Sequence, residues 1–147
     1  MRRLMLLLVG IGLLAVPATT AAAPLPAATC ENVEETWEGW SIPEFDADGN
    51  FVGNEVFGSA LGGSLAGVNT VTRTTPGGTL HFTGALSFEN TAYGSFPAVS
   101  SGILTPSGNL KITVWLVNGE SGIFTTHGTF SLSTGEWQIQ VRGRICA

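Results

Sequence analysis

Apolar residues recur along this chain with a period of two, and this pattern constrains the fold more than any other feature. In the clearest stretch, Trp137, Ile139, Val141 and Ile145 share one face and the residues between them, including Gln138, Gln140, Arg142 and Arg144, the other. Side chains alternate across a β-strand, so the pattern predicts half-buried strands with one dry face and one wet face. No segment shows the 3.6-residue period of a helix. We therefore expect an all-β, antiparallel fold.

Turn sequences rich in glycine, proline and asparagine divide the chain into eight expected strands. These cover roughly residues 33–42, 50–59, 62–74, 78–88, 97–105, 109–118, 122–132 and 136–146. The connections are short, apart from a longer stretch around Tyr93 and Gly94, and short connections force hairpins. An open sheet would leave two unpaired edges, whereas closure removes both. The sequence thus predicts one up-and-down β-barrel.

The two cysteines, Cys30 and Cys146, lie near the two ends of this predicted barrel. With an even number of strands, the first strand starts beside the point where the last one ends. An odd number would separate the cysteines by about 30 Å, and a disulfide requires Cα atoms about 4.4–6.8 Å apart. We therefore expect a Cys30–Cys146 disulfide. Lipid attachment to Cys30 is the alternative, although Ala27-Ala28-Thr29 before it lacks the leucine and the small final residue of a lipoprotein signal.

The N-terminus has the layout of a secretory signal peptide. Arg2 and Arg3 precede 13 apolar residues, Leu4 to Val16, and a run of small residues ends at Ala23. A spanning helix needs about 20 apolar residues, so a membrane anchor is the weaker interpretation. We expect residues 1–23 to be removed and residues 24–147 to form one secreted or periplasmic domain.

The expected mature chain is acidic. It keeps four Lys/Arg and eleven Asp/Glu, a net charge of 4 − 11 = −7, and seven of the acids lie between Glu31 and Asp48. Such a rim repels phosphate backbones and anionic lipids, so we do not expect nucleic acid as a partner. We also expect no membrane span in the mature chain. A solubilising face explains the acids, and a site for a cation or a basic partner is the alternative.

The segment from Glu44 to Glu55 partly matches a calcium-binding loop, with Asp46, Asp48 and Glu55 as candidate ligands. Neither flank is helical, and an ordinary hairpin turn explains the same residues. We therefore expect no catalytic metal and no cofactor here, and at most a weak calcium site.

We predict no catalytic residues. His81 and His127 fall on the outward faces of expected strands, and no serine has the setting of a hydrolase nucleophile. The tryptophans can pack the core or the rim, or stack on a sugar. Expected inward residues that would contact a ligand are Phe82, Phe88, Val114, Phe130, Trp137 and Ile139.

Several glycine-rich segments resemble small secreted barrels. Gly78-Thr79-Leu80-His81-Phe82-Thr83-Gly84, the stretches 119–124 and 128–135, and the closing Gly143-Arg144-Ile145-Cys146 are similar to strands of allene oxide cyclases and dirigent proteins. Glu120 replaces the second glycine of the motif, and no catalytic residue of those families maps onto this chain. The resemblance implies an eight-stranded, calycin-like barrel.

An eight-stranded barrel is either filled by side chains or leaves room for one small ligand. We therefore expect non-catalytic binding of a small apolar ligand or a surface partner. A first alternative is an isomerase or cyclase acting on an oxidised lipid, for which Tyr93, Glu89 and Glu55 are the candidate inward groups. A second is a structural or adhesive surface protein. The oligomeric state is left open.

Overall fold

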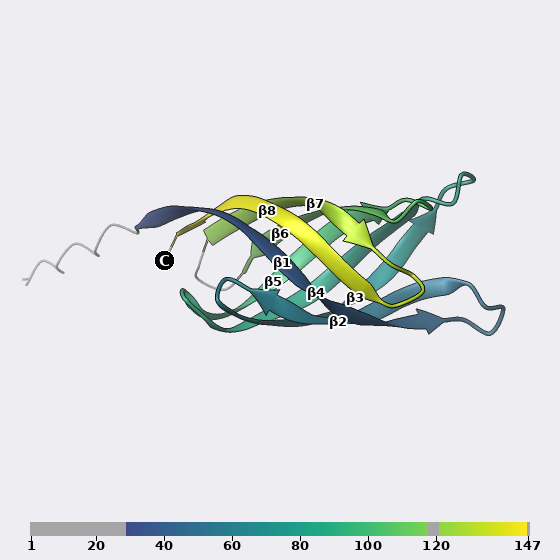
Figure 1. The fold of residues 1–147 in the computed structure, drawn as a ribbon, viewed down its shortest axis with the longest axis horizontal. Coiled ribbons are helices and arrows are strands. Elements are labelled where there is room, and N and C mark those ends of the chain that lie inside the picture. Colours follow the sequence, from purple (N-terminus) through teal and green to yellow (C-terminus); the bar gives the residue numbers. More distant parts are fainter. Residues whose placement is uncertain (1–28, 118–120, 147) are drawn as a thin grey trace, which may run out of the picture.

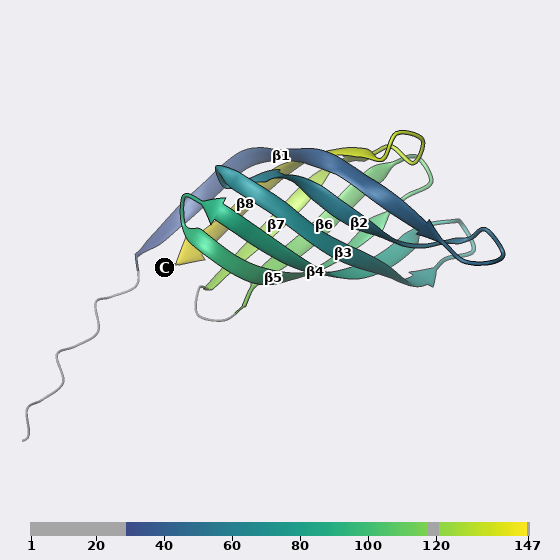
Figure 2. The same cartoon turned by 90° about the horizontal axis from the view of Figure 1, so that it is seen from below.

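The computed structural model describes residues 29–117 and 121–146, and they form a closed barrel of eight antiparallel strands (Figures 1 and 2). The expected signal peptide lies outside the described residues. The strands are β1 (Cys30–Phe45), β2 (Phe51–Ala60), β3 (Gly63–Thr74), β4 (Leu80–Thr91), β5 (Gly94–Leu104), β6 (Asn109–Leu116), β7 (Ser121–Phe130) and β8 (Glu136–Cys146). The predicted fold class is confirmed. No helix among these residues is long and apolar enough to cross a membrane.

The barrel closes where β1 pairs with β8, and we call this junction the seam. Its register runs from Cys30 opposite Cys146 to Trp40 opposite Glu136. The two cysteines form a disulfide, as the even number of strands predicts.

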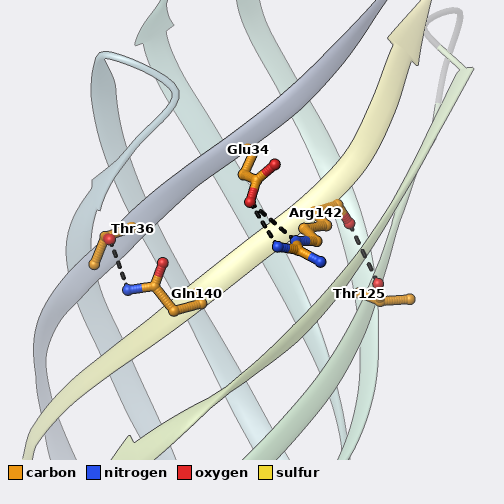
Figure 3. A network of polar contacts seen from close by, with 5 residues as sticks. All are labelled: Glu34, Thr36, Thr125, Gln140 and Arg142. Carbon is orange, nitrogen blue, oxygen red and sulfur yellow. Dashed lines mark hydrogen bonds and ion pairs between the residues drawn. The ribbon is translucent and has the colours of Figure 1, made fainter.

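Polar side chains bridge the outer face of the seam (Figure 3). The Arg142 guanidinium contacts Glu34 at 2.8 Å, and Gln140 Nε2 donates to Thr36 Oγ1 at 2.9 Å. Because both ionic side chains are about 70% exposed, their pair contributes at most about 1 kcal/mol. The backbone ladder and the disulfide therefore hold the seam closed.

The strand registers fix the tilt of the barrel. We start at Ile42 on β1 and step from each residue to its paired partner on the next strand, through β2 to β8. The path returns to β1 at Asn32, so the barrel has a stagger of 42 − 32 = 10 residues. With strands about 4.8 Å apart and a rise of about 3.3 Å per residue, this stagger tilts the strands by about 40° from the barrel axis. A row of paired residues therefore runs diagonally over the surface.

The strand boundaries differ most from expectation in β1 and at the turn between β4 and β5. β1 starts three residues earlier and ends three residues later, because it pairs with β8 as far as Cys30 and with β2 as far as Phe45. The connection near Tyr93 is not long: β4 continues to Thr91 and β5 begins at Gly94. Left-handed backbone at Asn90 (φ 54°) and Gly94 (φ 100°) makes this tight turn possible.

Aromatic side chains fill the end of the barrel that holds the disulfide. The Trp37 ring packs edge-on against Phe88 and Phe124, with centroids 5.3 and 5.5 Å away, and Phe96 lies against Phe88. Trp37, Phe88 and Phe124 are at most 1% exposed. We call these four residues the aromatic plug. Because they fill this half of the barrel, an internal cavity can lie only in the other half.

The predicted alternation of faces is confirmed. The inward set is buried, consisting of Phe82, Phe88, Val114, Phe130, Trp137, Ile139 and Val141. Of the residues expected outside, His127, Gln140 and Arg142 are exposed. His81 is half-buried beside Arg73.

Candidate functional site

A cavity of about 60 Å³ lies inside the half of the barrel opposite the disulfide. Its wall is almost entirely apolar, and Trp37 forms its floor on the side of the aromatic plug. The half-exposed lining residues Phe51, Val71 and Leu80 lie next to the β1–β2 and β3–β4 turns. The cavity therefore opens at this end, which is on the right in Figure 1.

The volume sets the size of what can enter. A buried water needs about 10–15 Å³ on this scale, and a cavity that takes up benzene measures about 150 Å³. A space of 60 Å³ thus has room for about four waters or a few heavy atoms. The barrel is neither completely filled nor hollow, and a longer molecule would have to leave its remainder in the mouth.

Three polar side chains, which we call the polar cluster, interrupt the apolar wall. Ser100 Oγ donates a hydrogen bond to Asn69 Oδ1, and Asn69 Nδ2 donates to Asn54 Oδ1, both at 3.3 Å. Asn54 and Ser100 are only 8% and 4% exposed. Among the described residues, Asn54 Nδ2 makes no hydrogen bond, and no fully buried side-chain nitrogen or oxygen lacks a partner. The Asn54 Nδ2 is therefore partly accessible, and the chain of hydrogen bonds ends in a donor that a molecule in the cavity can reach.

Five of the six residues expected to contact a ligand line this cavity, namely Phe82, Val114, Phe130, Trp137 and Ile139. The sixth, Phe88, belongs to the aromatic plug and does not reach it. That these side chains bind a ligand stays a prediction.

Sequence reasoning missed the polar cluster. Asn54 lies two residues from Val56, Asn69 two residues from Val71, and Ser100 two residues from Ala98. Each therefore shares the inward face of its strand, and alternation could have found them singly. Their convergence follows only from the strand registers.

The disulfide end holds a second group of polar residues, separated from the cavity by the aromatic plug. Glu35 points inward and accepts hydrogen bonds from Trp37 Nε1 and, at 2.6 Å, from the Leu61 amide. The Tyr93 hydroxyl donates to Glu31 at 3.1 Å. Burial first, then the hydrogen bond to Glu31 and the negative charges of Glu31 and Glu35, raise the pKa of Tyr93. Glu35 was not predicted, although it lies between inward Val33 and Trp37.

The three groups proposed for isomerase chemistry do not meet at the cavity. Glu55 and Glu89 are exposed on the outer surface, and Tyr93 lies at the other end of the barrel. Hydrogen bonds from Ser87 and then Ser95 lower the pKa of Glu89. None of the described residues that line the cavity has an ionisable side chain. The described wall therefore offers no general acid or general base.

Two of the three calcium candidates, Asp46 and Asp48, lie in the turn between β1 and β2. Asp46 Oδ1 accepts hydrogen bonds from the amides of Asp48 and Asn50, and its carboxylate also binds the Asn50 side chain. These bonds, with that from the Asn50 side chain first, lower the pKa of Asp46. Glu55 lies on the outer face of β2, paired with Ile42 and Val68. Across residues 29–117 and 121–146, no three His, Cys, Asp or Glu side chains group as metal ligands would.

Comparisons with models of known families, with curated proteins and with solved structures found no match to this chain. The expected eight-stranded antiparallel barrel is confirmed by the structure of the chain itself, at the level of coarse architecture.

Proposed function

We propose that this protein is an exported, non-catalytic binding protein that takes up a small neutral molecule in its barrel. The observation that carries the proposal is the polar cluster in the wall of an otherwise apolar cavity. Ligand sites combine apolar walls with a few convergent polar groups that orient the ligand. The disulfide supports an oxidising compartment, where such bonds persist.

The hydrogen-bond direction supports a ligand with an acceptor group. Because Asn54 Oδ1 already accepts from Asn69, the free group facing the cavity is the Asn54 amide, which is a donor. A ketone, aldehyde or ester oxygen satisfies it. A carboxylate fits less well, since no cation lines the described cavity wall and burying an unpaired charge is costly.

The isomerase or cyclase alternative, which the resemblance to allene oxide cyclases would permit, has less support. It needs an acid or tyrosine at the substrate, and Glu35 and Tyr93 lie beyond Trp37 on the far side of the aromatic plug. The cavity also accommodates only a small part of a lipid.

The test compares 2-pentanone, pentane and pentanoate as ligands, with tryptophan fluorescence and calorimetry as readouts, because Trp37 and Trp137 line the cavity. We expect 2-pentanone to bind most tightly. Replacing Asn54 with the similarly sized leucine removes the donor and should weaken its binding about tenfold, which corresponds to one hydrogen bond of about 1.4 kcal/mol.

The serines of β5 provide a matched pair of variants. Ser100 faces the cavity and Ser101 faces solvent, so Ser100→Ala should weaken binding and Ser101→Ala should not. If Asn54→Leu binds 2-pentanone as tightly as the original protein, or if the three ligands bind alike, the polar cluster does not select the ligand and the proposal is wrong.

A further inference from the structure

A shallow hollow lies on the outer surface of the barrel, over strands β8, β1 and β2. Its floor is the backbone of Gly39 on β1 and Gly58 on β2, which are paired. On the inner side of this floor the Trp137 ring packs so closely that a Cβ on either glycine would come within 2.7 Å of it. The hollow is therefore separate from the cavity, because a layer of backbone and the Trp137 indole lies between them.

Trp40 forms one wall of the hollow and is the most exposed tryptophan of the chain. It is 55% exposed, compared with 39% for Trp115, whereas Trp37 and Trp137 are buried in the core. Phe57, on the neighbouring strand, stacks on the Trp40 ring with centroids 5.6 Å apart and planes inclined by 25°. Phe57 does not line the hollow, so it supports the indole from one side while the ring stays open to the hollow.

Polar side chains surround the exposed ring. Glu136 of β8 lies directly beside Trp40. Glu38, the next outward residue of β1, lies between Gln138 and Ser59. All four polar residues are exposed, and with strands about 4.8 Å apart the row from Gln138 to Ser59 spans about 10 Å. The carboxylates accept hydrogen bonds, whereas the amide and the hydroxyl both donate and accept them.

We propose that this hollow binds a neutral sugar ring, with the C–H face of the sugar on Trp40 and its hydroxyl groups on the surrounding polar side chains. A pyranose ring has an apolar face made of C–H groups and a rim of hydroxyl groups. An exposed, supported aromatic ring bordered by hydrogen-bonding side chains is complementary to both parts. This site lies on the outside of the barrel and does not depend on the ligand proposed for the cavity.

The charge of the hollow favours an uncharged sugar. It is bordered by two carboxylates, and none of the described residues that line it is Lys or Arg, so sulfated, phosphorylated and uronic acid sugars are repelled. Glu38 and Glu136 accept hydrogen bonds from Gln138 at 3.4 Å and from Thr134 at 3.0 Å, which positions both carboxylates as acceptors for hydroxyl groups. A small organic cation is attracted by the carboxylates and the indole, but it has no hydroxyl groups to pair with Ser59 and Gln138.

Titration with the neutral disaccharides cellobiose, lactose and mannobiose tests the proposal on the chain beginning at Pro24, which keeps every residue of the described barrel. We expect at least one of them to bind with a dissociation constant of about 1 mM and to shift the NMR signal of the Trp40 indole N–H, which is identified by its absence in Trp40→Ala. Trp40→Ala should weaken binding about tenfold or more, and Trp40→Phe, which keeps an aromatic ring, should restore part of it. Trp115→Ala removes the other exposed tryptophan and should leave binding unchanged. Circular dichroism verifies that all three variants fold.

Two further variants distinguish a sugar from other ligands and this site from the cavity. Glu38→Gln keeps a hydrogen-bonding group and removes its charge, so it should change sugar binding by less than about threefold. Asn54→Leu, in the cavity wall, should leave sugar binding unchanged, so the two sites fail or succeed separately. Three results overturn the proposal: no binding of any of the three disaccharides up to about 50 mM, sugar binding that persists in Trp40→Ala, or tighter binding of tetramethylammonium or galacturonate than of the neutral sugars.

Discussion

The disulfide at the seam makes the most direct prediction about stability. We consider the double variant Cys30→Ser, Cys146→Ser. Cys30 is exposed and Cys146 is half-buried, so the change removes little packing from the folded barrel. The main effect is on the unfolded chain, which loses a cross-link between residues 116 positions apart. The chain-entropy estimate for a loop of that length is about 4.8 kcal/mol.

Measured losses usually fall below this estimate, so we expect the free energy of unfolding to decrease by about 2–5 kcal/mol. Urea unfolding followed by circular dichroism measures the change. With a slope of about 1–3 kcal/mol/M, the midpoint should fall by roughly 1 M or more. The original protein treated with a reductant should behave like the variant, which serves as the control. A loss below about 1 kcal/mol in both samples would refute the reasoning, because it would mean that the cross-link does not restrict the unfolded chain.

Four further predictions concern single residues. Phe88→Ala removes a fully buried ring of the aromatic plug and should lower the free energy of unfolding by about 3–5 kcal/mol, whereas Thr70→Ala, at an exposed position on the outer side of β3, should change it by no more than about 0.5 kcal/mol in the same urea titration. Glu35→Leu leaves the Trp37 and Leu61 donors unpaired and should cost about 1–3 kcal/mol, with Glu38→Leu as the exposed control. The raised pKa of Tyr93 means that folding favours its protonated form, so its contribution to stability is present below about pH 10 and is lost as the pH rises through the raised pKa. In Tyr93→Phe the melting temperature should therefore depend less on pH above about pH 10, and an unchanged pH dependence would contradict this account. The Asp46 carboxylate is already hydrogen-bonded within its turn, so micromolar calcium should not shift the melting temperature. A shift that Asp46→Ala abolishes would instead identify a calcium site.

The period-two pattern was sufficient to predict the architecture because each strand has one buried face. Trp137, Ile139 and Val141 are apolar for that reason, and the turns between strands have characteristic sequences. The tight turn at Tyr93 was missed because one of its two left-handed residues is Asn90, and asparagine is a weaker turn signal than glycine.

The candidate site could be predicted only in part. Apolar members such as Phe82 and Ile139 follow from alternation. The polar cluster does not, because Asn54, Asn69 and Ser100 come from β2, β3 and β5, and a shift of one register position would separate them. The cavity volume likewise depends on how side chains interdigitate, which no local pattern records.

The seam also bears on chain connectivity. Cys30 and Cys146 are direct neighbours, so a short linker between them would turn the barrel into a continuous ring of strands. New ends could then be opened between Gly49 and Asn50, in an exposed turn whose interruption breaks no strand. Chains with adjacent ends tolerate such circular permutation. In this protein no strand has to be first, and a permuted chain that begins with β2 and ends with β1 should build the same barrel.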